Sequence, residues 1–341
     1  MAQRNPLQKH IEPGSDRPKT RALMLGACFL LIIAAGLPIR VAAEPDGVTL
    51  FQQEKYSEAA SCLATDLKNQ PGNPSVNFYM GRSLLALNQP AEAVGYLKKA
   101  TVLEPGSADY RFWLGVGHWA TTDFEEERRS YQEALKLNPK HLSANLYLGH
   151  SYMDQGDWQK ALTQYDRVLG IDADFPEALY NRAVAFGKLD KITEAREAWK
   201  SYLSRYHLGT WAFQAVEQLN QTGDFSYRTH WLGSARVIMP KVVFAPSGNN
   251  PAGQSIGALE TIKGTLERNP HLSLHIVAYA QGNAKLAELR AKALKAHILK
   301  SNPDILSSRV RVSWFNVPEK ISSGDKTYVL KESVNFITAT N

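Results

Sequence analysis

Residues 74–107, PSVNFYMGRSLLALNQPAEAVGYLKKATVLEPGS, decide the fold, because their arrangement of small, large and helix-ending residues returns 34 positions later. Glycine, alanine and proline occupy positions 8, 27 and 32 of this segment and of the next one, residues 108–141 (Gly81 and Gly115, Ala100 and Ala134, Pro105 and Pro139). The register continues without insertion from residue 40 to residue 209. Self-similarity at a fixed period of this length predicts a repeat protein with five units in phase.

The spacing within each unit predicts two helices packed as a hairpin. Mostly small residues at positions 8, 20 and 27 let the two helices approach closely, whereas position 24 is always large (Leu97, Tyr131, Tyr165 and Trp199). Proline at position 32 ends the second helix, because it cannot donate a backbone hydrogen bond. One hairpin cannot bury its apolar face alone, so neighbouring hairpins must stack.

Three places depart from a uniform series of repeats. Glu127 stands at position 20 of the third unit, where a small residue is expected, and it predicts a loose or shifted second helix. The first unit has an abbreviated first helix. Residues 210–219 are predicted to form a closing helix that covers the apolar face of the last repeat.

The five in-phase units resemble the tetratricopeptide-repeat (TPR) family over about half of the chain. The resemblance implies an all-α TPR superhelix whose inner wall comes mainly from positions 2, 5, 9, 12 and 13 of each first helix. Here that wall is apolar and aromatic, which suits an extended or helical segment of a protein partner. The alternative for Phe112 and Trp119 is packing against adjacent helices. The predicted partner-binding residues are Phe78, Arg82, Phe112, Val116, Trp119, Leu146, His150, Met153, Tyr180 and Val184.

The N-terminal segment, residues 1–43, predicts export across a membrane. Residues 22–39 carry no charge over 18 positions and follow a polar stretch with five Lys or Arg. Val41 and Ala43 fit a small-residue cleavage site. The sequence therefore allows a cleaved signal peptide or an uncleaved anchor helix, which would make the membrane a partner. We expect a periplasmic location in a Gram-negative-type cell, either soluble or anchored to the inner membrane.

The helical period ends near residue 220. Residues 221–236 lack a clear period and are predicted to link the repeats with their closing helix, residues 44–220, to a C-terminal domain, residues 237–341. Hydrophobic patterns in that domain predict the order β-α-β-α-β-β. The expected elements are a strand at 242–245, a helix at 255–269, a strand at 271–279, a helix at 284–300, and strands at 309–315 and 328–338.

This order of elements, together with Asn283, Leu286 and Arg290, resembles the OmpA-like peptidoglycan-binding family over about 100 residues. The resemblance implies an α+β domain with Asn283 and Arg290 in a peptidoglycan-type site, where Arg290 would hold the diaminopimelate end of the stem peptide. The family carries an Asp in the loop before this Asn, whereas residues 279–283, YAQGN, contain none. A bound ammonium group would therefore lose its counter-charge. The alternative for Arg290 is a local cap or ion pair.

Motifs for catalysis and metal binding are absent from the sequence. Its nine histidines form no HExxH motif and no close cluster with Cys or Asp, and Gly-x-Ser-x-Gly is absent. We therefore expect no enzyme activity, no cofactor and no metal. The basic charge lies at the two ends, and residues 237–341 carry 13 Lys or Arg against 7 Asp or Glu. Such a surface suits an anionic envelope polymer or is a solvated face, and no nucleic-acid partner is expected.

Together these features predict a non-enzymatic cell-envelope scaffold. The groove of the repeats would bind a protein partner, and the OmpA-like domain would contact peptidoglycan or another part of the envelope. A second hypothesis is a protein-only assembly adaptor for a secretion or polysaccharide-export machine, with a degenerate C-terminal domain. A third is a polysaccharide or lipid binder that uses the basic C-terminal domain.

Overall fold

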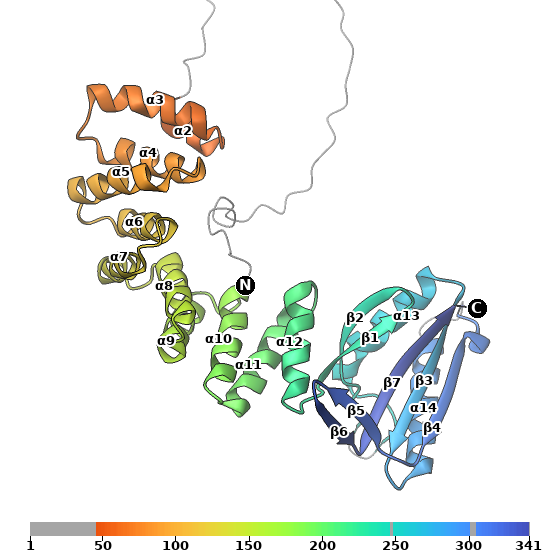
Figure 1. The fold of residues 1–341 in the computed structure, drawn as a ribbon. Helices are drawn as coiled ribbons and strands as arrows, with labels where there is room; N and C mark the ends of the chain where they lie inside the picture. Colours follow the sequence, from red (N-terminus) through yellow and green to blue (C-terminus); the bar gives the residue numbers. More distant parts are fainter. Residues whose placement is uncertain (1–45, 246–247, 301–304, 341) are drawn as a thin grey trace, which may run out of the picture. The chain divides into compact units, whose positions relative to one another are not determined.

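The computed structural model describes residues 46–245, 248–300 and 305–340 (Figure 1). The predicted signal or anchor helix, residues 1–43, lies outside the described residues. Within the described ranges, no helix combines the length and apolar character needed to cross a membrane. The chain forms two compact units, one up to Leu148 and one from Gly149 onward. The boundary expected near residue 220 therefore does not coincide with the division between these units.

The helices of the repeats follow the predicted period. The first helices begin 34 residues apart and are α4 (Pro74–Ala86), α6 (Ala108–Ala120), α8 (Leu142–Asp154) and α10 (Pro176–Lys188). The second helices keep the same spacing and are α3 (Tyr56–Asn69), α5 (Pro90–Leu103), α7 (Phe124–Leu137), α9 (Trp158–Ile171) and α11 (Ile192–Arg205). The short α2 (Gly47–Gln52) precedes α3, as the abbreviated first unit predicts.

One residue in the left-handed conformation sets the turn inside each hairpin. Positive φ recurs every 34 residues, at Glu54 (62°), Asn88 (59°), Thr122 (62°), Gly156 (77°) and Asp190 (55°). Positive φ is uncommon for residues other than glycine. Its recurrence at one repeat position shows that the hairpin requires it. Caps then start some of the second helices, since Asp123 accepts a hydrogen bond from the Glu126 amide at 3.3 Å.

Glycine at position 8 makes room for the large residue at position 24. A Cβ atom on Gly81 would lie 2.6 Å from Cγ of Leu97. A Cβ atom on Gly115 would lie 2.5 Å from Cε1 of Tyr131. Both distances are far below van der Waals contact, and a close-packed interior cannot absorb such overlap. This pair of positions therefore fixes how closely the two helices of a repeat pack.

The sequence predicts that the second helix at Glu127 is loose or shifted, and the predicted shift is wrong. α7 begins and ends in phase with the other second helices, and the Glu127 side chain is buried within it. The neighbouring Tyr131 is also fully buried. Burial, with a further contribution from the charge of Glu127, raises the pKa of the Tyr131 hydroxyl well above its ordinary value. The repeat thus accepts a carboxylate at position 20 without changing its helix.

The predicted closing helix is α12 (Thr210–Gln221), which begins 34 residues after α10. Its Ala212, Ala215, Val216 and Leu219 share one apolar core with α11. This helix does not end the packed structure, because Tyr227 and Ile238 join the same core. Those two residues come from the strands that follow, so the repeats and the next region of the chain share a core.

Residues 221–236 are not the linker that the sequence predicts. They contain the end of α12 and the strand β1 (Tyr227–Leu232), which pairs antiparallel with β2 (Ala235–Pro240). Most side chains of β1 are half-buried whichever face they occupy. Because no face of β1 is clearly apolar, the alternation that marks a strand is missing from its sequence.

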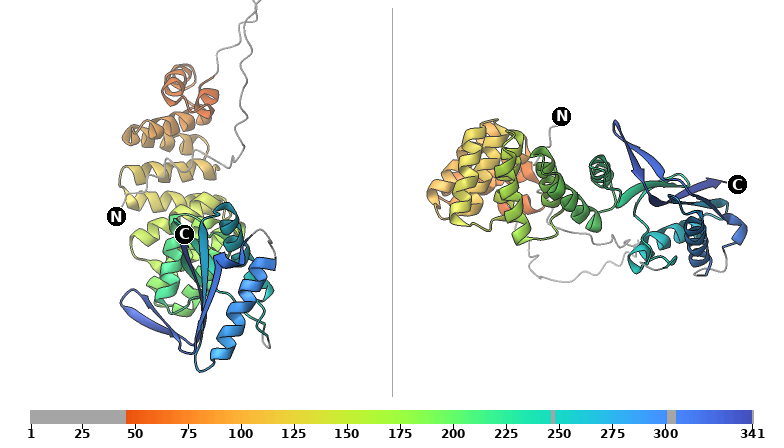
Figure 2. Two further views of the ribbon diagram at one scale, coloured as in Figure 1. Left: turned by 90° about the vertical axis from the view of Figure 1, so that its right-hand side faces the viewer. Right: turned by 90° about the horizontal axis from the view of Figure 1, so that it is seen from below.

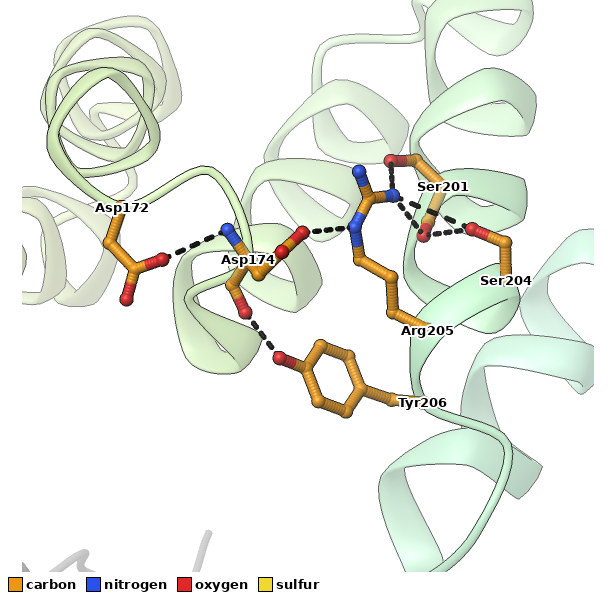
Figure 3. Close-up of polar contacts among 6 residues, drawn as sticks. All are labelled: Asp172, Asp174, Ser201, Ser204, Arg205 and Tyr206. Atoms are coloured by element: carbon orange, nitrogen blue, oxygen red, sulfur yellow. Dashed lines mark hydrogen bonds and ion pairs between the residues drawn. The ribbon is translucent and has the colours of Figure 1, made fainter. Parts of the chain in front are cut away.

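A polar joint ties the turn between α9 and α10 to the end of α11 (Figure 3). The Arg205 guanidinium donates to the Asp174 carboxylate, and the Tyr206 hydroxyl donates to the Asp174 backbone carbonyl. Arg205 also donates to the Ser201 hydroxyl at 3.0 Å, while Asp172 accepts from the Asp174 amide at 3.0 Å. Both charged partners are well exposed, so this pair adds little stability and mainly shapes the turn.

The C-terminal region is built around β3 (Leu272–Ala280), the central strand of a three-stranded sheet ordered β4-β3-β7. β4 (Val310–Phe315) runs parallel to β3, and β7 (Glu332–Thr340) runs antiparallel to it. α13 (Ile256–Arg268) and α14 (Ala284–Lys300) lie together on one face of this sheet (Figure 2). Apolar residues of both helices and of β3 form the core between these layers.

Two of the expected strands differ from the structure. Residues 242–245 form only a single bridge, between Phe244 and Pro251. The strand expected at 328–338 is divided into β6 (Lys326–Leu330) and β7, and β6 pairs with the unforeseen β5 (Glu319–Ser323). Most side chains of β5 and β6 are exposed or half-buried, so burial imposes no apolar alternation on this hairpin. The elements predicted between residues 255 and 315 agree with the structure within a few residues.

Candidate functional site

A hollow of about 410 Å³ lies on the surface formed by α4 and α6. Its volume is within the range of small-ligand pockets. Aromatic rings and one guanidinium dominate its lining. The lining residues are Ser75, Phe78, Tyr79 and Arg82 from α4 and Asp109, Tyr110 and Trp113 from α6.

Helical spacing explains why these side chains meet. Ser75, Phe78, Tyr79 and Arg82 are three or four residues apart and therefore share one face of α4. Asn73 fixes where this helix begins, because its side-chain oxygen accepts a hydrogen bond from the Val76 amide at 3.2 Å. The 34-residue period then places the corresponding face of α6 beside that of α4.

Aromatic rings surround the Arg82 guanidinium. Its central carbon lies 4.2 Å from the ring centre of Trp113 and 4.5 Å from that of Phe51 in α2. Phe78 and Tyr79 follow at 5.4 and 5.8 Å. Each distance is within the reach of a cation–π interaction, which is stronger for partly desolvated cations. The rings hold the guanidinium in the hollow.

Arg82 has no anionic partner among the described residues. Its Nε atom is buried without a hydrogen-bond partner there. The carboxylate of Asp109, the acidic residue of the hollow, lies instead 3.0 Å from Nε2 of His141. Burial lowers the pKa of Arg82, while the charges of Tyr79, Tyr56 and Asp109 act in the opposite direction. The guanidinium has therefore lost part of its hydration without gaining a counter-ion.

Several predicted wall residues are buried and cannot form an open surface. Phe112, Val116 and Leu146 are only 3%, 2% and 1% exposed. The Phe112 ring stacks on Tyr131, with 5.7 Å between ring centres. For Phe112 the geometry therefore agrees with packing against adjacent helices. Trp119 stays half-buried on α6.

The remaining predicted wall residues belong to the second unit and contact other helices of that unit. Nε2 of His150 lies 3.1 Å from the Asn181 amide nitrogen. Tyr180 stacks on Trp211 with 5.2 Å between ring centres, and its hydroxyl donates to Gln214 at 2.9 Å. Met153 accepts a weak hydrogen bond from Tyr165, and Val184 packs against the core of α10–α12.

The sequence prediction missed Tyr79, Trp113, Tyr110 and Phe51. Tyr79 and Trp113 both occupy position 6 of their repeats, next to position 5 of the predicted wall. Two aromatic residues at the same position of consecutive repeats were the available signal. Phe51 left no such signal, because it lies in the shortened first unit.

The peptidoglycan-type site residues have local roles in the structure. The Asn283 side chain accepts a hydrogen bond from the Leu286 amide at 2.9 Å and so caps the start of α14. Arg290 donates to the Glu332 carboxylate at 2.7 Å and lies 4.5 Å from the ring centre of Phe244. Arg290 therefore has its own counter-ion, in agreement with the alternative of a local pair.

Across 46–245, 248–300 and 305–340, no three His, Cys, Asp or Glu side chains lie close enough to hold a metal ion.

Comparison with known families identifies the repeats. A tetratricopeptide-repeat model matches residues 78–142, and two further TPR models match residues 149–190 and 177–206. These segments are tetratricopeptide repeats. The TPR matches do not extend to the strands that follow α12.

Relatives of the TPR segment occur in proteins of different size. BBSome complex member BBS4 of Xenopus tropicalis is 31% identical over 122 residues, which are 36% of this chain and 24% of that protein. The chain thus spans about a quarter of the length of this relative. The crystal structure of MamA is 24% identical, with a TM-score of 0.45, and the match covers 47% of this chain and 93% of MamA. YrrB, described as a TPR protein with an unusual peptide-binding site, is 18% identical over 50% of this chain and 87% of YrrB, with a TM-score of 0.45.

Proposed function

We propose that the TPR segment binds an extended segment of a protein partner in the hollow formed by α4 and α6. Tetratricopeptide repeats are generally non-catalytic scaffolds for protein interaction. Arg82 carries the proposal, because a half-buried cation among aromatic rings, without a counter-ion in the described residues, is an incomplete site. Aromatic and arginine side chains of this kind dominate the energetics of protein interfaces.

The proposed setting is the cell envelope. It rests on the uncharged residues 22–39 and the basic stretch before them. A chain with this N-terminus would be exported, and the repeats would meet their partner beyond the membrane.

A protein-only assembly adaptor fits the C-terminal region better than a peptidoglycan-binding scaffold does. Residues 237–341 resemble an OmpA-like domain in sequence, but the Arg290 guanidinium is already paired with Glu332. A peptidoglycan stem peptide would have to displace that carboxylate. It would also find no Asp in residues 279–283. We therefore propose that this region docks to protein, with wall binding as the second candidate.

The hollow can be tested with defined peptides. A phage library of random 12-residue linear peptides is selected on the full chain, and synthetic forms of the binders are titrated by fluorescence anisotropy. Trp113→Ala should weaken binding by at least about tenfold, because it removes an aromatic wall of the hollow. Val102→Ala, an exposed position on α5, is the matched control and should leave binding unchanged. Equal affinities for wild type and Trp113→Ala, with both proteins folded by circular dichroism, would place the site elsewhere.

The two roles of the C-terminal region can be separated by co-sedimentation with purified peptidoglycan sacculi. The full chain should stay in the supernatant. Glu332→Gln, which removes the counter-ion of Arg290, tests whether the pair blocks the site. Strong sedimentation of the wild-type chain would favour the wall-binding candidate instead.

A further inference from the structure

We infer that the hollow formed by α4 and α6 recognises an acidic side chain, Asp or Glu, on the partner segment, through the guanidinium of Arg82. This inference rests on the proposed function and adds the chemistry of the ligand. It follows from the contacts of Arg82, from the charges around the hollow and from the character of its walls.

Among the described residues, no acceptor contacts the buried Nε donor of Arg82. The neighbouring groups at 4.2–5.8 Å are the rings of Trp113, Phe51, Phe78 and Tyr79. Such rings attract the cation but do not replace the acceptors that water provided. A half-buried charge is costly until it is paired and hydrogen-bonded. A ligand that brings an acceptor with a negative charge therefore gains both interactions at once.

The shape of the guanidinium selects a carboxylate among such ligands. Its planar fork of N–H donors matches the two oxygens of a carboxylate, and this pairing is shorter and stronger than a neutral hydrogen bond. The lining of the hollow contains one basic and one acidic residue, Arg82 and Asp109, so that its formal charges balance. A dianion such as a phosphate group would meet one cation and the exposed carboxylate of Asp109. A single carboxylate fits this balance better.

The walls determine what accompanies the carboxylate. Phe78, Tyr79, Tyr110 and Trp113 supply an aromatic surface beside Arg82. The Phe78 and Tyr110 rings stack with 4.4 Å between their centres, which gives one wall a flat and rigid face. A hollow of about 410 Å³ has room for more than the carboxylate alone. The recognised segment therefore carries an acidic residue next to an apolar or aromatic one.

The test uses the peptides selected on the full chain. In each binder, Asp and Glu residues are changed one at a time to Asn and Gln, and affinity is measured by anisotropy. We expect one such change to weaken binding by at least about tenfold, because it removes one member of a desolvated charge pair. Arg82→Gln should cause a similar loss. Arg82→Lys, which keeps the charge without the planar fork, should lose less.

Controls separate this inference from the proposed function. Arg129→Gln removes an exposed arginine of α7 and should not change affinity. If Trp113→Ala abolishes binding while every acidic-to-amide change is silent, the hollow binds peptides but the carboxylate inference is wrong. If amidation of the peptide C-terminus causes the loss instead, the carboxylate is a chain end and the inference of an acidic side chain is wrong. Circular dichroism melts of the Arg82 variants exclude misfolding as the cause.

Discussion

Arg290 and Arg82 both lie against aromatic rings, but of these two only Arg290 has a counter-ion among the described residues. Arg290 in α14 lies 4.5 Å from the ring centre of Phe244 and pairs with Glu332 at 2.7 Å. Arg82 in α4 lies 4.2 Å from Trp113, and within the described residues no carboxylate pairs with it. The difference separates a guanidinium that the fold itself uses from one that is left for a ligand. The sequence resemblance points to Arg290 as a ligand site, whereas the contacts point to Arg82.

The largest effect on the free energy of unfolding is expected at the ion pair of Arg228 with Glu319 in the C-terminal region. Arg228 in β1 binds both carboxylate oxygens of Glu319, at 3.0 and 2.9 Å, and both side chains are largely buried. Arg228→Met should lower the free energy of unfolding by about 3–5 kcal/mol, because it leaves a buried carboxylate without its partner. Chemical denaturation of the full chain measures this loss.

The matched control is Arg311→Met, an exposed arginine of β4. It should change the free energy of unfolding by less than about 0.5 kcal/mol. Similar losses for Arg228→Met and Arg311→Met would show that the pair does not stabilise the region.

Acid should destabilise the same region through His230, which lies two residues after Arg228 in β1. Burial, followed by the nearby charge of Arg228, lowers the pKa of His230 from 6.5 to about 4, against the opposing charge of Glu319. Above pH 6.5 the ring is neutral in both states and contributes nothing. Between pH 6.5 and 4 only the unfolded state takes up the proton, so stability falls by about 3 kcal/mol as the pH falls.

Denaturation as a function of pH isolates this contribution when wild type is compared with His230→Phe. Glu319 loses its own contribution only at lower pH: burial would raise its pKa, but hydrogen bonds and the charge from Arg228 lower it overall. As the pH falls from 6.5 to 4, the His230→Phe variant should not show the part of the stability loss that His230 causes in the wild type. Parallel profiles for both proteins would contradict the assignment.

Much of the helical segment follows from sequence, because a hairpin imposes the same demands on each repeat. Small residues at position 8 and large ones at position 24 fix the packing, as Gly115 against Tyr131 shows. The hollow was harder to foresee. Arg82 occupies a predicted wall position, but the absence of a counter-ion depends on Asp109 contacting His141 rather than Arg82. The periodic pattern of the sequence does not show which of two possible partners a carboxylate contacts.

The C-terminal region was less predictable for a related reason. β1 and β5 pack with most of their side chains only half-buried or exposed, so their sequences lack the alternation of a one-sided strand. The pair of Arg228 with Glu319 joins residues 91 positions apart. Spacing along the chain cannot show contacts of this kind.

A smaller effect is expected where the arginine pair is partly solvated. Glu332 is 52% exposed at its side chain, and Arg290 is 15% exposed. Glu332→Gln should therefore cost about 1 kcal/mol, near the upper value for exposed pairs. Thermal melts at low and high salt measure the loss, which should shrink at 1 M NaCl because salt screens the pair. A loss above about 3 kcal/mol would mean that the pair is a buried one.

Arg82→Met should change stability less than the substitutions that break the Arg228 and Arg290 ion pairs. Arg82→Met removes cation–π contacts with Trp113 and Phe51, but it also removes a desolvated charge that has no counter-ion in the described residues. These contributions oppose each other, so the free energy of unfolding should change by less than about 1 kcal/mol. Denaturation of the variant beside Arg228→Met makes the contrast direct. A loss as large as that of Arg228→Met would show that Arg82 is a structural residue.

The coupling between Arg82 and the carboxylate of a selected peptide tests the central claim most directly. A double-mutant cycle combines Arg82→Gln with the acidic-to-amide change in the peptide, and anisotropy gives the four dissociation constants. We predict a coupling free energy of at least about 1.5 kcal/mol, as measured for close charge pairs at interfaces. In that case the double change weakens binding little more than either single change does. Strictly additive losses, with a coupling near zero, would contradict the claim that Arg82 is completed by an acidic ligand.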